Sequence, residues 1–148
     1  MEQIRDEMVV RAPSDRVWKA IQDPAEHASW HPMITKIAGK HALGQTRKCD
    51  VVIGKKSGVT EERCIVCEEP HRITWSIEQD SAGFSRMVSD WQAGFSIEPE
   101  SHGATRVTAQ SLFEPKRWVV RLMMPMVRRK FHQTQRAILR GLQERVEG

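Results

Sequence analysis

The sequence predicts an α+β fold in which a curved antiparallel sheet of about six to seven strands wraps around one long C-terminal helix. Three observations support this. Short segments of alternating apolar and polar residues fill positions 45–114, turn-forming residues separate them, and positions 115–146 have a helical pattern. A long antiparallel sheet buries one face, and only the last helix is large enough to cover it. A chain of 148 residues suits a single domain, residues 1–148.

The chain begins with one predicted strand and one predicted helix. Residues 4–11, "IRDEMVVR", alternate as a strand does. The following "APSDRVWKAIQ" has apolar residues at helical spacing, and Ser14 is its expected cap. We therefore expect this helix to pack through Val17, Trp18 and Ile21.

A second short helix is predicted to begin at "DPAE". Asp23 suits a helix cap, Pro24 suits the first helical position, and Glu26 stands three residues after the cap. The helix should end near Trp30, which we expect it to present toward the interior.

Two histidines near this helix, His27 and His31, stand four residues apart, a spacing that on a continuous helix lets two imidazoles share a metal ion. His31 precedes Pro32, however, and a residue before proline avoids the helical region. The H-E-x-x-H pattern of metalloproteases is also missing. We therefore expect no stoichiometric metal, and the chain offers no motif for a cofactor.

Consecutive antiparallel strands are predicted from position 45 onward. They are "QTRKCDVVI", "GVTEERCIVCEE", "ITWSIEQ", "FSRMVSDWQAGFSIEP", which begins at position 84, and "ATRVTAQSLFE". A four-residue turn at positions 55–58 would pair Gly54 with Val59 and place Cys49 opposite Cys64. Cys64 and Cys67 stand three apart on a strand and should face opposite sides of the sheet, which disfavours a redox or metal role.

The C-terminal segment carries the positive charge of the protein. Residues 116–148 hold nine basic and two acidic residues, or +7, although the whole chain carries only +4. This basic segment is either an ordinary solvated helix face or a surface for an anionic ligand group or for transient contact with an anionic membrane. Nucleic acid is a weaker candidate because no recognisable nucleic-acid module is present. Pro125 should kink or divide the helix, so residues 116–124 form either a mobile lid or a static first turn.

Three cysteines and a charged N-terminus without an apolar h-region indicate a cytoplasmic protein with reduced thiols. No stretch approaches the roughly 18 apolar residues that a membrane-spanning helix needs.

The sequence "VRAPSDRVWKAIQDPAEHASWHPMI" resembles the opening of START-like helix-grip proteins. The matching residues are Ala12, Pro13, Val17, Trp18, Asp23, Pro24, Trp30 and Pro32. "HGATRVT" before the last strand and the long final helix add to a resemblance that covers essentially the whole chain. More narrowly, the chain resembles the polyketide cyclase/dehydrase and lipid-transport (SRPBCC) family.

That resemblance implies a sheet that grips the C-terminal helix and a cavity between them for a hydrophobic small molecule. Members include lipid carriers, quinone-binding proteins, hormone receptors, and aromatases or cyclases. This chain lacks the glycine-rich loop of the pollen-allergen branch and has no tyrosine, which removes one proton donor from a cyclase mechanism. Binding or transport of a lipid, quinone or polyketide-like molecule is the function expected, and a cyclase, aromatase or dehydratase is the alternative.

Strand alternation and the apolar residues of the helices provide candidate ligand contacts that do not depend on the resemblance. They are Trp30, Val51, Cys64, Val66, Trp75, Ile77, Met87, Trp91, Phe95, Val107, Phe113, Leu122, Met123 and Met126. The polar residues in the inward register are Arg47, Glu62, Ser89 and Ser111, and we expect Arg47 and Glu62 to be solvated at the cavity rim. No catalytic residue is identified.

Overall fold

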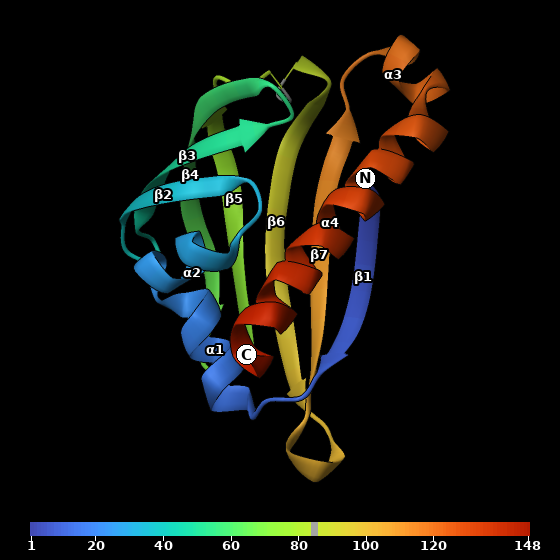
Figure 1. Ribbon diagram of the computed structural model, residues 1–148. Coiled ribbons are helices and arrows are strands. Elements are labelled where there is room, and N and C mark those ends of the chain that lie inside the picture. The colour runs from blue at the N-terminus through green and yellow to red at the C-terminus, as the bar shows by residue number, and fades with distance from the viewer. Residues whose placement is uncertain (84–85) are drawn as a thin grey trace.

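The computed structural model describes residues 1–83 and 86–148 and confirms the predicted α+β helix-grip fold (Figure 1). The strands are β1 (Glu2–Val10), β2 (Ile34–Gly39), β3 (Thr46–Ile53), β4 (Lys56–Glu68), β5 (Arg72–Asp80), β6 (Val88–Pro99) and β7 (Thr105–Pro115). The helices are α1 (Ser14–Gln22), α2 (Pro24–Trp30), α3 (Trp118–Leu122) and α4 (Met124–Glu147), and Ser101–Gly103 form a 3-10 turn. The strand predicted from position 84 begins at Val88, and positions 84 and 85 lie outside the described residues.

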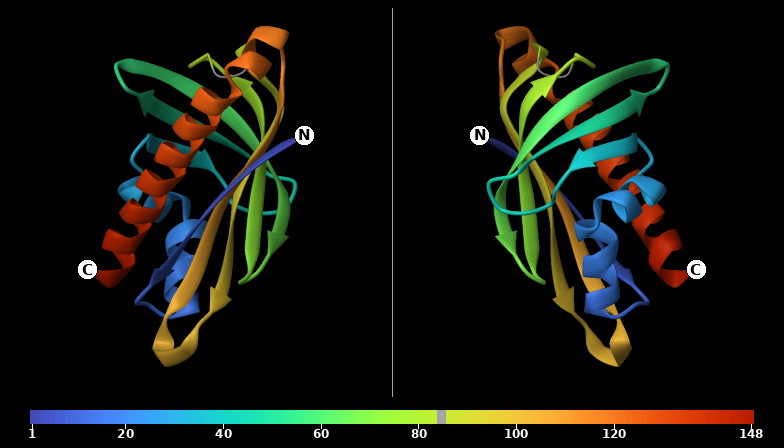
Figure 2. Two further views of the ribbon diagram at one scale, coloured as in Figure 1. Left: turned by 90° about the vertical axis from the view of Figure 1, so that its right-hand side faces the viewer. Right: turned by 90° about the vertical axis from the view of Figure 1, so that its left-hand side faces the viewer.

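The strands form one antiparallel sheet in the order β1-β7-β6-β5-β4-β3-β2. Register shifts interrupt the pairing of β2 with β3, of β4 with β5 and of β6 with β7. Such bulges bend a strand and increase its twist. The sheet therefore curls, and α4 runs along its concave face from α3 at one end to α1 at the other (Figures 1 and 2).

The helix starts and ends follow local chemistry. Asp23 caps α2 as predicted, because its side chain accepts hydrogen bonds from the backbone N–H groups of Ala25 and Glu26. The predicted cap of α1 is wrong: Ser14 is already the first helical residue, and its hydroxyl hydrogen-bonds to that of Thr105.

The final helix is divided, as Pro125 predicts. α3 ends at Leu122, and Pro125 lies in the first turn of α4, where its missing N–H costs no helical hydrogen bond. Among the described residues, no helix is long and apolar enough to cross a membrane.

The hairpin between β3 and β4 differs from the prediction. Its turn has two residues, Gly54 and Lys55, because Ile53 pairs with Lys56. Gly54 has φ +62°, a conformation that favours glycine and permits so tight a turn.

The shorter turn changes the cysteine register. Cys49 therefore lies opposite Thr60, and the predicted pairing with Cys64 is wrong. The bulge between Cys64 and Val66 also overturns the expectation for the C-x-x-C pair, because Cys64 and Cys67 pack against the same hydrophobic cluster.

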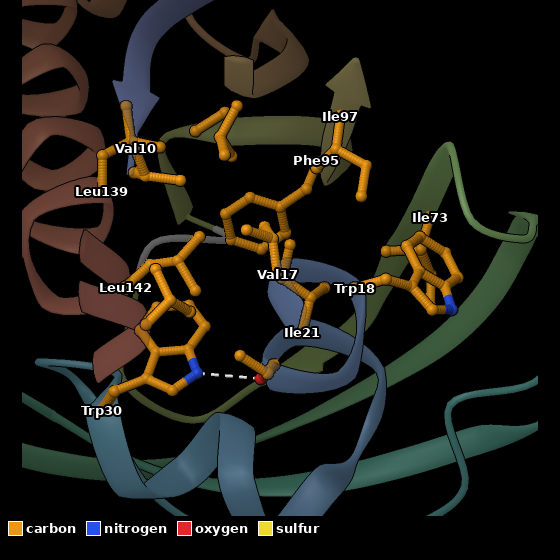
Figure 3. Close-up of a cluster of buried hydrophobic side chains, with 14 of the residues drawn as sticks. Val10, Val17, Trp18, Ile21, Trp30, Ile73, Phe95, Ile97, Leu139 and Leu142 are labelled. Atoms are coloured by element: carbon orange, nitrogen blue, oxygen red, sulfur yellow. Dashed lines mark hydrogen bonds between the residues drawn. The ribbon is translucent and has the colours of Figure 1, made fainter. Parts of the chain in front are cut away.

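Three hydrophobic clusters stabilise the sheet and helices. The largest joins α1, α2 and the C-terminal half of α4 to the strands; in Figure 3, Trp30 lies among these side chains and its indole N–H donates to the backbone oxygen of Ala20. A second cluster joins α3 and the start of α4 to β1 and β7, and a third lies on β2 and β3.

Candidate ligand cavity

A cavity lies between the concave face of the sheet and α4. Its volume is about 140 Å³, which is room for several water molecules. Its lining comprises His27, His31, Met33, Ile34, Arg47, Val51, Ile53, Thr60, Glu62, Trp75, Ile77, Asp80, Trp91, Ala93, Gly94, Phe95, Ala109, Gln110, Ser111, Lys130, Phe131, Thr134, Gln135 and Ile138. The cavity thus touches all three hydrophobic clusters.

Most of this wall is apolar. Five of the predicted contacts line it: Val51, Trp75, Ile77, Trp91 and Phe95. The helix adds Phe131, whose ring meets that of Trp91 edge to face with centroids 5.9 Å apart. Gly94 has no room for a side chain, because a Cβ there would stand 2.3 Å from the carbonyl oxygen of Ile73 on β5.

The other nine predicted contacts lie elsewhere. Trp30, Cys64, Val107 and Phe113 are buried in the hydrophobic clusters. Val66 is partly exposed, Met87 is exposed, and neither lines the cavity. Leu122, Met123 and Met126 lie on the outer surface of α3 and the start of α4.

One end of the cavity is polar, and its centre is an ion pair between Arg47 and Glu62. The expectation that both are solvated rim charges is wrong, since they are only 3% and 7% exposed. Both Nε and Nη2 of Arg47 donate to Oε1 of Glu62, at 3.1 and 2.7 Å. The guanidinium carbon lies 3.8 Å from the centre of the Trp75 ring, and Thr60 donates to Oε2 of Glu62. The charge of Arg47 is therefore compensated inside the protein.

Two histidine rings donate hydrogen bonds to one backbone carbonyl at the C-terminal end of α1. The carbonyl oxygen of Ile21 in its last turn accepts from Nδ1 of His27 at 2.9 Å and from Nδ1 of His41 at 3.1 Å. A carbonyl can only accept, so Nδ1 of both rings carries the proton. Nε2 of His41 in turn accepts from Nη1 of Arg47 at 2.9 Å. The His41 ring is therefore neutral, with the lone pair of Nε2 directed at Arg47.

His31 is held in the opposite tautomer. It caps the C-terminus of α2 in an extended conformation, as Pro32 predicts. Its Nδ1 accepts from the backbone N–H groups of Met33 at 3.1 Å and Ile34 at 3.0 Å. A proton on Nδ1 would face these two donors, so the neutral ring carries it on Nε2.

Burial keeps these rings uncharged. Burial and then the nearby Arg47 charge lower the pKa of His31 to about 3 and that of His41 to about 3. The same causes, in the same order, hold the pKa of His27 well below its usual range. Within the described residues, no group of three or more His, Cys, Asp or Glu side chains is placed to hold a metal ion.

A second polar network crosses the cavity wall between β7, α4 and β1. Ser111 donates to the side-chain oxygen of Gln135 at 2.9 Å, and the Gln135 amide donates to Asp6 at 2.8 Å. His132 and Arg136 also bind the Asp6 carboxylate. These groups satisfy one another, so this side of the cavity offers a ligand few unpaired polar atoms.

Sequence patterns identified the apolar strands of the cavity but missed its histidines. The sequence indicated His27 and His31 only as a possible metal pair, and it gave no indication of His41. The useful signal was the inward register of Arg47 and Glu62, because a charged pair in that register needs partners if it is buried.

Comparison with known proteins agrees with this architecture. The model of the family described as polyketide cyclase / dehydrase and lipid transport matches residues 1–147. No curated protein matches the sequence.

Several solved structures share the fold. A START superfamily protein from Mycobacterium smegmatis has a TM-score of 0.77 at 19% identity over 98% of this chain and 97% of its own. The Zhui aromatase/cyclase from Streptomyces sp. R1128 has a TM-score of 0.78 at 15% identity over 99% and 93%. Norcoclaurine synthase from Thalictrum flavum has a TM-score of 0.74 at 14% identity over 97% and 84%. At such identities the likeness concerns the fold alone, whereas the family model covers nearly the whole chain, and the protein therefore belongs to the polyketide cyclase / dehydrase and lipid transport family.

Proposed function

We propose that this protein binds and transports a hydrophobic small molecule, of lipid, quinone or polyketide-like chemistry, in the cavity between the sheet and α4. The observation that carries the proposal is the lining: a mostly apolar wall with one polar group of residues around Arg47 and Glu62 and another around Ser111 and Gln135. Pockets of this composition take ligands by burying apolar surface, and the polar groups set orientation.

Displacement of an environment-sensitive hydrophobic dye tests this proposal. The native protein should bind the dye, and polycyclic or long-chain compounds should displace it. Trp91→Ala should change the dye affinity, because Trp91 lines the cavity. Trp118→Ala is the matched control, because Trp118 is 73% exposed and lies outside the cavity. Dye binding that appears only on partial unfolding would contradict the proposal.

A cyclase or dehydratase is the second candidate. It is favoured by the position of His27 in the cavity wall, where Nε2 has no hydrogen-bond partner among the described residues and can accept a hydrogen bond from a reacting hydroxyl group. An aromatic β-hydroxyketone tests this, since its dehydration yields a conjugated ketone with strong ultraviolet absorbance. Catalysed dehydration that is lost in His27→Phe, with dye binding retained, would support an enzyme. No dehydration above the rate in buffer would leave only the carrier function.

We further propose that α3 docks on anionic membranes while the ligand is exchanged. Large apolar side chains project from the surface here: Trp118 and Leu122 are each 73% exposed and Met126 is 67% exposed. Arg117, Arg121 and Arg129 are exposed and stand within three residues of them in the sequence, and residues 116–143 contain no acidic residue. An apolar surface with a tryptophan and a basic rim suits the interface of an anionic bilayer.

Vesicle flotation tests the docking surface. The protein should float with vesicles that contain phosphatidylserine, less so with pure phosphatidylcholine, and less at high salt, because the attraction is screened. Leu122→Ala should weaken binding, whereas Leu43→Ala should not, although Leu43 is 64% exposed. Equal recovery of both variants, or no flotation at all, would contradict docking through α3.

A further inference from the structure

His27 presents an unused hydrogen-bond acceptor at the polar end of the cavity. The side chain lines the cavity and is only 1% exposed. Its Nδ1 donates to Ile21, and its buried Nε2 has no hydrogen-bond partner within the described part of the chain. Because a buried acceptor without a donor costs free energy, this nitrogen favours a ligand that brings a hydrogen-bond donor.

His31 presents the complementary donor. Its ring stacks on that of His27, with centroids 5.4 Å apart and planes inclined by 15°. Two backbone N–H groups occupy Nδ1 of His31, which leaves an N–H at Nε2. Two adjacent rings that line one cavity therefore offer one acceptor and one donor, both uncharged.

Charged ligand groups fit this end poorly. All three nitrogens of the Arg47 guanidinium already donate hydrogen bonds, two to Glu62 and one to His41. A carboxylate would meet the lone pair of His27 with no unpaired cation beside it, and an ammonium would lie near the Arg47 charge. A ketone accepts from His31 but leaves Nε2 of His27 unsatisfied. A hydroxyl group donates and accepts at once, as a water molecule does.

We propose that the cavity selects ligands that carry an uncharged hydroxyl group, an alcohol or a phenol, on an apolar body. The hydroxyl donates to Nε2 of His27 and accepts from Nε2–H of His31, while the apolar body lies against the wall formed by Trp75, Ile77 and Phe95. This assignment rests on the proposed function, because it names the chemistry of the ligand in the same cavity.

Three matched probes test the assignment: naphthalene, naphthol and naphthoate, each titrated into the wild-type protein near neutral pH. Naphthol should bind roughly fivefold to tenfold more tightly than naphthalene, the gain of a net hydrogen bond, and naphthoate should bind most weakly. In the wild-type protein, naphthol but not naphthalene should shift the nitrogen resonance of Nε2 of His27. This measurement does not depend on the folding of any variant.

A variant separates this assignment from the proposed function. His27→Phe should lower the ratio of naphthol affinity to naphthalene affinity, because the hydroxyl keeps the His31 donor but loses its acceptor. Equal affinity of the wild type for naphthol and naphthalene, with an unchanged His27 resonance, overturns the hydroxyl assignment and leaves the carrier function standing. Tightest binding of naphthoate overturns it as well. Failure of all three probes to bind overturns both proposals.

Discussion

Arg47 and Glu62 are buried together, and each depends on the other for compensation of its charge. Taking two charges out of water costs several kcal/mol, and the ion pair, the Trp75 face and Thr60 together offset that cost. A pair of this kind adds little net stability over an apolar pair of similar volume. Removal of one partner, however, leaves a buried charge uncompensated.

Variants of this ion pair should therefore differ in stability in a specific order. Glu62→Leu alone should lower the free energy of unfolding by about 3–5 kcal/mol. The double variant Arg47→Met, Glu62→Leu should recover much of that loss, because no charge is left unpaired. Urea denaturation of both proteins measures the difference. A double variant as unstable as the single one would show that the pair matters for reasons other than charge.

The three neutral histidines predict acid sensitivity. In the unfolded chain histidine takes up a proton near pH 6.5, whereas the pKa of His31 and of His41 in the fold is about 3. Between these two pKa values the unfolded state binds more protons than the folded state. The contribution of these rings to the free energy of unfolding is therefore fully present above about pH 6.5 and decreases as the pH falls toward 3. The free energy of unfolding changes by at most about 1.4 kcal/mol per pH unit for each ring.

The substitution His31→Asn isolates one of these rings. The amide oxygen of asparagine can accept from Met33 and Ile34 as Nδ1 does, but it does not titrate. Urea unfolding at pH 8 measures the structural cost of the change. Unfolding at pH 5 should then show a smaller acid loss for the variant than for the wild type. Identical acid losses would argue that His31 is not held neutral in the fold.

At the scale of elements, the contact between α2 and α4 depends on Gly141. A Cβ at this position would stand 2.5 Å from the backbone oxygen of Trp30. Glycine therefore lets the C-terminus of α2 approach α4 closely, and that approach positions the histidines at the polar end of the cavity.

Gly141→Ala should consequently destabilise the protein, although alanine is normally better than glycine inside a helix by about 1 kcal/mol. Overpacking against backbone costs typically about 1–3 kcal/mol, so the net effect should be a lower thermal midpoint. Gln133→Ala, at an exposed site of α4, is the control and should change the midpoint little. A higher midpoint for Gly141→Ala would mean that α2 moves away without cost.

α3 buries little of its surface against the rest of the protein. It has five residues, and Val120 is its only buried residue. Amide hydrogen exchange in residues 118–122 should therefore be faster than in residues 138–142 of α4. Slower exchange in α3 when dye fills the cavity would support the lid interpretation, and unchanged exchange would support a static first turn. Equal protection of both segments would contradict the expectation.

At the scale of the molecule, the cavity lies where the three hydrophobic clusters meet. A ligand that fills it adds contacts to every cluster, and it binds the folded state only. At a free concentration one hundred times its Kd, such a ligand should raise the free energy of unfolding by about 2.7 kcal/mol. Calorimetric scans with and without naphthol measure this as a rise in the thermal midpoint. A ligand that binds without raising the midpoint would have to bind the unfolded chain equally well.

The sequence by itself determined the order of the elements except β2, the face that β3, β5 and β7 bury, and the division of the last helix. These features depend on side chains within a few residues of one another: alternation along β3 and β5, the Asp23 cap, and Pro32 and Pro125 as helix boundaries. They also led to five of the residues that line the cavity.

Only the tertiary structure decided the chemistry of the polar end. The turn at Gly54 and the bulges set the register of Arg47 and Glu62, and the curled sheet buries them. His27 and His41 reach the same carbonyl of Ile21 from positions 6 and 20 residues along the chain. The tautomers of these rings, and hence the ligand group they fit, follow from backbone groups that the fold brings to each nitrogen. Local pattern carries no information about such contacts, because they exist only after the sheet has closed over α4.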